Sequence, residues 1–228
     1  MKITVIGASG QIGSRVVRLL AAAGHDVVAA SLSTGANVLT GEGLVEALSG
    51  ADALVDVVNS PSFDDGPVMD FFTASSRNLV AAAKETGVGH YVALSIVGTD
   101  GLPDSGYMRA KVAQEKNITE SGLPYSIVRA TQFQEFAEAI TASLVVGDEV
   151  RVPDARIQLI SVDDVAAEVA TVAQASLAMY PEVLREQLGI GADRRVVCAI
   201  SFGYADTAHP ANSYRTSRAD LDAAVRWI

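Results

Sequence analysis

The first thirteen residues constrain the fold of this chain more than any other stretch. Lys2–Ile6 is rich in β-branched residues and predicts a buried strand. Three glycines follow at regular spacing, Gly7, Gly10 and Gly13, and lead into apolar residues at helical spacing. Glycines let a backbone turn tightly and approach a phosphate closely, and the first N–H groups of a helix point at such an anion. We therefore predict a strand, a phosphate-binding turn and a helix.

A second apolar run, Asp26–Ala30, comes where a dinucleotide-binding βαβ unit needs its next strand. An acid at the far end of that strand would hold the ribose of NAD, but this chain has Ser31 there. A 2′-phosphate would not be repelled, although residues 31–40 contain no Arg or Lys to bind it. We predict NADP or NAD, with NADP slightly favoured. The predicted contacts are Gly7, Ser9, Gly10, Gln11, Ile12, Gly13 and Ser31.

Composition and charge exclude several other classes of protein. The 228 residues, 49% of them hydrophobic, suffice for one good-sized core. A net charge of −10 disfavours binding to nucleic acid or to anionic lipid. Cys198 is the single cysteine, so no intrachain disulfide can form. Because the first predicted strand begins at residue 2, we expect no signal peptide, and we expect no membrane span because no apolar run approaches ~20 residues. We expect a cytoplasmic protein without a metal site.

Strand and helix patterns alternate over the first 172 residues. They predict helices at 11–23, 41–48 and 68–86, and strands at 53–58, 89–95 and 123–130. This alternation is typical of a doubly wound (Rossmann) α/β domain with a mostly parallel sheet. Asn59 follows one strand at the edge where such sheets bind ligands, and we add it to the cofactor contacts. Asp56, inside that strand, is interpreted as structural, pointing between layers toward a partner.

The later part of this domain gives three smaller predictions. Gln132 and Phe133 follow a strand and are candidates to line the pocket, with a place in the core as the alternative for Phe133. Residues 147–158 resemble a charged hairpin. A helix then starts near residue 162, with Ser161 or Asp163 as its cap.

Tyr107 and Lys111 lie four residues apart in a predicted helix and so share one face. A lysine ammonium beside a tyrosine hydroxyl lowers the pKa of the tyrosine and makes it usable as an acid or base. Ser95, at the preceding strand end, can hold a carbonyl oxygen while hydride arrives from a nicotinamide. The Tyr-x-x-x-Lys pattern also occurs on solvated helix faces, but its place in a nucleotide-binding fold favours catalysis.

Five motifs in register resemble the short-chain dehydrogenase/reductase superfamily, in its atypical branch of NmrA-like, NAD(P)-binding proteins. They are Gly7–Gly13, Ala93–Thr99, Tyr107–Lys111, Leu123–Ala130 and Ile160–Val165. The resemblance implies that Ser95, Tyr107 and Lys111 form the catalytic triad, with Lys111 also holding the nicotinamide ribose. It implies that Asn78 supports the lysine through water. Several members of this branch lack the triad and act as nucleotide-sensing regulators.

The last part of the chain departs from that family. Residues 173–228 predict a short α/β tail and resemble the end of FMN-dependent nitroreductases in Val196–Tyr204 and His209–Arg218. That resemblance implies a flavin-phosphate contact at Arg215 or Arg218. The rest of a nitroreductase is absent, so a working FMN site is not expected. We interpret residue 172 as the end of the NAD(P)-binding domain and a fusion junction, with a divergent substrate region as the alternative.

Together these patterns predict an enzyme, an NAD(P)H-dependent oxidoreductase of the short-chain dehydrogenase/reductase type. It would transfer hydride to a small carbonyl or quinone-like substrate. The alternative is a regulatory protein that senses NAD(P) without turnover. The sequence predicts a small-molecule partner and leaves the substrate and the oligomeric state open.

Overall fold

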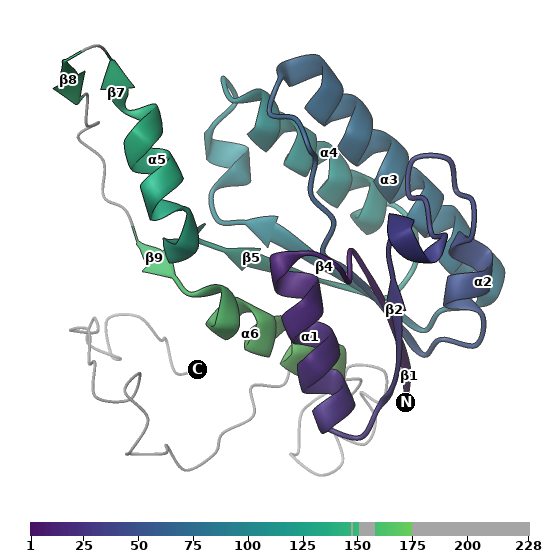
Figure 1. The fold of residues 1–228 in the computed structure, drawn as a ribbon. Helices are drawn as coiled ribbons and strands as arrows, with labels where there is room; N and C mark the ends of the chain where they lie inside the picture. The colour runs from purple at the N-terminus through teal and green to yellow at the C-terminus, as the bar shows by residue number, and fades with distance from the viewer. Residues whose placement is uncertain (147, 151–157, 175–228) are drawn as a thin grey trace, which may run out of the picture. The chain divides into compact units, whose positions relative to one another are not determined.

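The computed structural model describes residues 1–146, 148–150 and 158–174. These residues lie within one compact unit, built on a sheet of five parallel strands in the order β2-β1-β3-β4-β5 (Figure 1). The strands are β1 (Lys2–Ile6), β2 (Asp26–Ala30), β3 (Ala53–Asp56), β4 (His90–Ile96) and β5 (Tyr125–Ala130). This arrangement confirms the predicted doubly wound α/β class.

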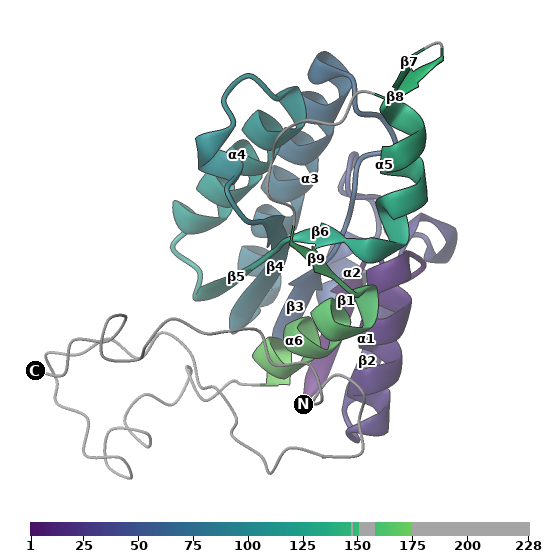
Figure 2. The same ribbon diagram turned by 90° about the vertical axis from the view of Figure 1, so that its left-hand side faces the viewer.

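Helices cover both faces of the sheet (Figure 2). One face carries α1 (Gln11–Ala22) and α6 (Val162–Gln174), and the other carries α2 (Leu44–Leu48), α3 (Asp65–Thr86) and α4 (Gly106–Thr119). On the first face Val16 and Leu20 of α1 pack with Val169 of α6 over β1 and β3. On the second, Leu79 of α3 and Ile118 of α4 pack on Leu54 and Tyr91. Each face of the sheet therefore has its own apolar core.

The predicted strands at 2–6 and 26–30 are confirmed, but some other boundaries differ. The helix predicted at 41–48 begins only at Leu44, because Gly41 and Gly43 have φ values of 84° and 72°. A right-handed helix cannot include such residues. The strand predicted at 53–58 ends at Asp56, whose side chain accepts a hydrogen bond from the N–H of Val58 at 3.2 Å. An Asp side chain that closes such a local turn ends the extended backbone.

The long helix α3 begins three residues before its predicted start and ends as predicted. Pro67 lies in its first turn, where a proline costs no helical hydrogen bond, so the helix can begin at Asp65. At the other end Gly87 has a φ of 71° and closes the helix after Thr86.

Short elements follow β5. Strand β6 (Gln132–Phe133) pairs with β9 (Leu159–Ile160), and between them lie a 3₁₀ turn, Gln134–Phe136, and α5 (Ala137–Ser143). Strands β7 (Val145–Val146) and β8 (Glu149–Val150) pair antiparallel, so a hairpin begins at Val145, two residues before the predicted range of 147–158. The rest of that hairpin and the predicted elements of the tail lie outside the described residues.

The start of α6 confirms a predicted cap. The Ser161 hydroxyl accepts a hydrogen bond from the N–H of Asp164 at 3.0 Å. The carboxylate of Glu135 accepts the N–H of Val162, with oxygen distances of 3.0 and 3.1 Å. Two side chains therefore satisfy free N–H groups of this helix.

The order of the strands determines where a ligand can bind. Strands β1 and β3 are neighbours, and the connection from β1 runs to β2 on one side while the connection from β3 runs to β4 on the other. Open parallel sheets bind ligands outside the carboxyl ends of the strands at such a switch point. Gly7 follows β1 and Asn59 lies three residues after β3, so both flank this point. Among the described residues, no helix combines the length and the apolar content that a membrane span requires.

Candidate functional site

The glycine turn between β1 and α1 is closely packed. Gly7 has a φ of 86°, and a Cβ placed on it would lie 3.1 Å from backbone atoms of Val57 and Val58. A Cβ on Gly13 would lie 2.1 Å from the carbonyl oxygen of Gly7. Real Cβ atoms do not approach backbone atoms so closely, so the turn requires glycine at residue 13. The N–H groups of Gly7 and Ala8 both donate to the carbonyl of the last residue of β2, at 3.0 and 3.1 Å.

The start of α1 presents free donors to an anion. Gly10 is the N-cap, and no side chain caps the helix there. The first turn contains no acidic residue, so the positive end of the helix dipole is not neutralised. Ser9, Gly10 and Gln11 are exposed, whereas Ile12 and Gly13 are buried and can contribute only backbone groups. This arrangement fits the pyrophosphate of a dinucleotide.

Ser31 lies directly after β2, and its hydroxyl is used locally. Its Oγ lies 2.8 Å from the Oγ of Ser33, and its backbone N–H donates to Thr34 at 2.9 Å. The side chain is largely buried. Its predicted contact with the cofactor stays a prediction.

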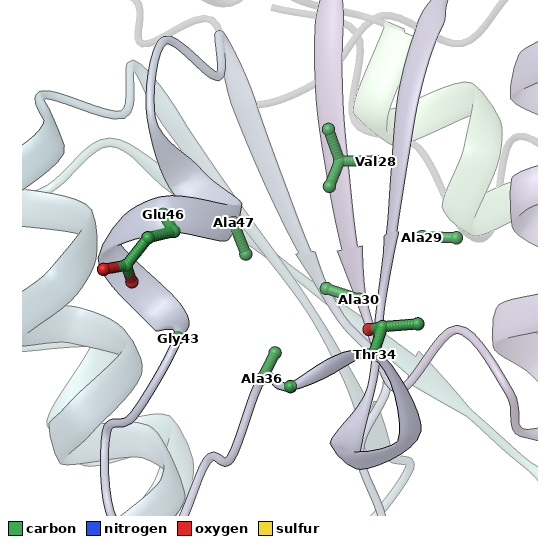
Figure 3. Close-up of a pocket in the computed structure, with 9 residues that line it drawn as sticks. Val28, Ala29, Ala30, Thr34, Ala36, Gly43, Glu46 and Ala47 are labelled. Carbon is green, nitrogen blue, oxygen red and sulfur yellow. The ribbon is translucent and has the colours of Figure 1, made fainter.

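A cavity of about 320 Å³ opens beside Ser31, between β2 and α2 (Figure 3). Its lining is mostly small and apolar, with Thr34 and Glu46 as the polar side chains. It is lined by Val28, Ala29, Ala30, Thr34, Gly35, Ala36, Gly43, Glu46 and Ala47. None of the predicted site residues lines it. It flanks the outer edge of β2 and not the crevice between β1 and β3.

The Tyr107 hydroxyl lies at the carboxyl edge of the sheet. It donates a hydrogen bond of 2.6 Å to Oδ1 of Asn59, which also accepts the N–H of Ser60 at 3.0 Å. The ring packs against Phe72 and against the exposed ring of Phe63, with centroid distances of 5.7 and 5.4 Å. The structure therefore brings together Tyr107, predicted to be catalytic, and Asn59, predicted to contact the cofactor.

The predicted effect of Lys111 on this tyrosine is wrong. Burial raises the pKa of Tyr107 to about 12, and the hydrogen bond with Asn59 opposes the increase. The lysine does not lower this pKa, because its ammonium faces other partners. It donates to the carbonyl of Leu94 at 2.9 Å and to Oε1 of Gln114. Burial lowers the pKa of Lys111 to about 8, although Asp56 and a neighbouring glutamate act to raise it.

Ser95 and Thr99 are buried residues with hydroxyl side chains. Ser95 lies near the end of β4, and Thr99 begins the 3₁₀ turn that follows it. Each is 2% exposed, and neither hydroxyl has a hydrogen-bond partner among the residues that the structure describes. A buried polar group without a partner costs about 1–3 kcal/mol. An oxygen of a bound molecule could supply the missing bond. Sequence reasoning proposed Ser95 and missed Thr99, whose signal was its place in the motif Ala93–Thr99.

Asp56 has hydrogen-bond partners, as its structural interpretation requires, although the sequence identified none of them. It is fully buried, and its Oδ2 accepts hydrogen bonds from Tyr91 and from Gln114, both at 2.9 Å. Burial raises the pKa of Asp56, although Lys111, Tyr91, Val58 and Gln114 each act to lower it. Sequence reasoning missed Gln114, because nothing in a single sequence links it to a residue 58 positions away.

Among the described residues, Asn78 contacts a loop and not Lys111, so its support of the lysine through water stays a prediction. Its amide donates to the carbonyls of Val38 and Leu39, both at 2.9 Å. It therefore holds the loop before α2, and Gln114 is the amide side chain that contacts Lys111.

Comparisons with known proteins identify the family to which most of this chain corresponds. A family model described as NAD(P)H-binding matches residues 7–175. The photosystem II assembly factor Ycf39 of Synechocystis is 27% identical over 149 residues, 59% of this chain and 46% of that protein. The match therefore spans about half the length of this relative. A 4-nitrobenzoate reductase of Nocardioides is 38% identical over 74 residues, 32% of this chain and 30% of the reductase.

Solved structures show the same fold. An NADPH-dependent quinone oxidoreductase from Escherichia coli, complexed with NADPH, aligns with a TM-score of 0.58 and 22% identity. The alignment covers 82% of this chain and 75% of the oxidoreductase. The family model matches most of the chain, and the glycine turn and the strand order agree with that match. The chain therefore belongs to the NAD(P)H-binding family.

Proposed function

We propose that this chain is an NAD(P)H-dependent oxidoreductase of the short-chain dehydrogenase/reductase type, which transfers hydride to a small carbonyl or quinone-like compound. The position of the Tyr107 hydroxyl carries the proposal. It donates at 2.6 Å to Asn59, two residues after Val57, whose backbone packs against Gly7 of the phosphate turn. A proton donor therefore lies close to the turn that would hold the cofactor.

The residues present fit a dinucleotide. The backbone from Gly7 to Gly13 would hold the pyrophosphate, and a Cβ at Gly7 or Gly13 would meet the backbone of that turn or of Val57 and Val58. Ser31, Asn59 and Lys111 are the further proposed contacts, with NADP slightly favoured over NAD. Bound there, the nicotinamide would supply the hydride.

Each proposed catalytic side chain has a distinct task. Tyr107, with a pKa of about 12, keeps its proton at neutral pH and can donate it to the oxygen of a carbonyl as that carbonyl is reduced. The free hydroxyl of Ser95 can donate a hydrogen bond to the same oxygen. Lys111 would place a positive charge beside them and hold the ribose, as the family resemblance implies.

Several finer statements belong to the same proposal. The named activities of the quinone oxidoreductase and of the nitrobenzoate reductase support a substrate with a reducible, conjugated group. A nitroreductase-like origin for residues 173–228 stays part of the proposal, on the resemblance of Val196–Tyr204 and His209–Arg218. The acidic charge and the proposed chemistry support a small-molecule partner and a cytoplasmic location.

Titration with NADPH, followed by a panel of quinones and small carbonyl compounds, tests this function. We expect saturable binding measured by nicotinamide fluorescence, and loss of nicotinamide absorbance with at least one compound of the panel. A folded protein that binds neither NADPH nor NADH would refute the proposal.

Replacement of Ser95 with alanine is expected to separate stability from activity. The variant loses a buried hydroxyl that has no partner among the described residues, so the free energy of unfolding should stay equal or rise by about 1 kcal/mol. Turnover should fall about 100-fold, because the carbonyl oxygen loses a donor. Thr99→Val is the matched control, since it removes the other such hydroxyl. Denaturant unfolding and steady-state kinetics measure both effects, and full activity in Ser95→Ala would contradict the assigned role.

One observation favours a second candidate, an NAD(P)-sensing protein without turnover. A relative that shares 27% identity over 149 residues is named as an assembly factor and not as an enzyme. This candidate predicts tight binding of NADPH with no oxidation across the whole panel. The same titration therefore separates the two functions.

A further inference from the structure

The interior of the site contains a chain of polar groups that links separate elements of the fold. It runs from Asp56 at the end of β3 through Gln114 to Lys111, both on α4. These three side chains are between 0 and 3% exposed. Burial of a charged group costs several kcal/mol unless the charge is compensated, so this chain of contacts requires an explanation.

The chemistry of the groups determines which atom donates and which accepts in every hydrogen bond of this chain of contacts. A lysine ammonium has donors only, so the atom of Gln114 that faces it must be the amide oxygen Oε1. The amide nitrogen of Gln114 then points at Asp56 and donates to Oδ2 at 2.9 Å. Tyr91 donates to the same oxygen at 2.9 Å, and the N–H of Val58 donates to Oδ1 at 3.2 Å. Asp56 thus receives three donors, the arrangement that suits an ionised carboxylate.

The other end of the chain of contacts fixes the lysine beside the proposed catalytic serine. The ammonium donates to the carbonyl of Leu94, the residue before Ser95, at 2.9 Å. It also lies over the ring of Phe72, 4.4 Å from the ring centroid, in a cation–π contact. The same ring packs edge-on against Tyr107. The position of Lys111 is therefore coupled to both other members of the proposed triad.

We propose that Asp56 and Gln114 are positioning residues, which fix the orientation of the Lys111 ammonium and sustain its positive charge inside the site. The proposal rests on the function proposed above, in which Lys111 places a positive charge beside Tyr107 and Ser95 and holds the cofactor. The negative charge of Asp56 acts through the oriented amide of Gln114, since the carboxylate and the ammonium form no direct ion pair within 4.0 Å among the described residues.

The groups around Lys111 determine how its charge depends on pH. Asp56 from β3 and Glu115 from α4 both favour the ammonium, and Glu115 is itself paired with Arg129 of β5. From α3 the contact is Phe72, which carries no charge, and from β4 it is the neutral carbonyl of Leu94. Loss of the Asp56 charge should therefore make Lys111 lose its proton at lower pH.

Nitrogen NMR of the lysine side chains tests the charge directly, because the chain has four lysines, Lys2, Lys84, Lys111 and Lys116. Lys111→Met assigns the signal. In the unchanged protein we expect a titration midpoint of about 8 for Lys111. Asp56→Asn and Gln114→Leu should each lower it by about one pH unit or more, the usual effect of a lost counter-charge or acceptor. Asn117→Ala, which breaks a 2.8 Å contact of α4 with Ser76, should leave it unchanged.

Kinetics and binding complete the test. We expect Asp56→Asn and Gln114→Leu to weaken NADPH binding or to lower kcat at least 10-fold, and to move the alkaline limit of kcat/KM to lower pH. An unchanged lysine midpoint in both folded variants would overturn the proposal, as would a shifted midpoint with unchanged NADPH affinity and turnover. If the midpoint shifts and NADPH binding weakens while no compound is reduced by any form, the positioning role stands and the oxidoreductase function fails. Gln114→Leu keeps the test valid if Asp56→Asn does not fold.

Discussion

Gly13→Ala is expected to weaken NADPH binding at least 100-fold, the largest loss of binding that the structure predicts for a single methyl group. The added Cβ would lie 2.1 Å from the oxygen of Gly7 and 2.8 Å from the Cα of Ala8. These are backbone atoms of the phosphate turn, so relief of the clash requires movement of the turn itself. A loss of 100-fold corresponds to about 2.7 kcal/mol, within the range that overpacking of a tight site costs.

Gly66→Ala is the matched control for this substitution. Gly66 lies in the first turn of α3, and a methyl group added there would have no heavy atom within 4 Å apart from its chain neighbours and its own helix. Because Pro67 follows, any cost of alanine at this position falls on the start of α3 and not on the phosphate turn. Nicotinamide fluorescence titrations and thermal unfolding should be measured for both variants. Gly10→Asp adds a second comparison, because it places a carboxylate at the N-cap of α1, where the anion would bind. Unchanged affinity in Gly13→Ala would place the dinucleotide elsewhere.

The turn could be predicted from sequence because its cause is local. Gly7 and Gly13 are six residues apart, and the clash that excludes a side chain at Gly13 arises within that short segment. Strand β1 could likewise be predicted from sequence, because the residues within it, mostly β-branched, all favour an extended backbone. Where the prediction of α2 was wrong, two glycines with positive φ overrode a helical pattern. Local chemistry thus explains both the success and the error.

The interior of the site could not be predicted in the same way. The contact between Asn59 and Tyr107 joins residues 48 positions apart, and the contact between Asp56 and Gln114 joins residues 58 apart. Such contacts depend on how α4 packs against the ends of β3 and β4, and a single sequence carries no signal for that packing. The four-residue spacing of Tyr107 and Lys111 was read as a direct contact between hydroxyl and ammonium. The buried acceptors at Leu94 and Gln114 instead hold the ammonium.

This difference changes the chemical role of the tyrosine. A lysine against the hydroxyl would favour the phenolate, whereas the Tyr107 hydroxyl donates to the uncharged amide of Asn59. Burial outweighs the opposing effect of that hydrogen bond on the pKa, and Tyr107 stays protonated at neutral pH. A protonated tyrosine suits the reduction of a carbonyl, in which the new alkoxide must receive a proton.

Tyr107→Phe is accordingly expected to lower turnover about 10²–10⁴-fold, the usual contribution of a positioned proton donor. NADPH affinity should change by less than about 3-fold, because the phenyl ring keeps the packing against Phe72 and Phe63. Steady-state kinetics on whichever quinone or carbonyl compound is reduced, with NADPH titration in parallel, measure the two effects.

Two further variants decide what the loss of turnover would mean. Tyr125→Phe removes the hydroxyl of a tyrosine that is 43% exposed at the start of β5, at the edge of the sheet opposite the carboxyl ends of the strands, and should leave turnover unchanged. Asn59→Ala removes the acceptor that orients the Tyr107 hydroxyl and should lower kcat, since the proton donor is then no longer held in one direction. Full turnover in Tyr107→Phe would assign proton donation to water or to another residue, and the hydroxyl at the carboxyl edge of the sheet would then serve only to hold Asn59.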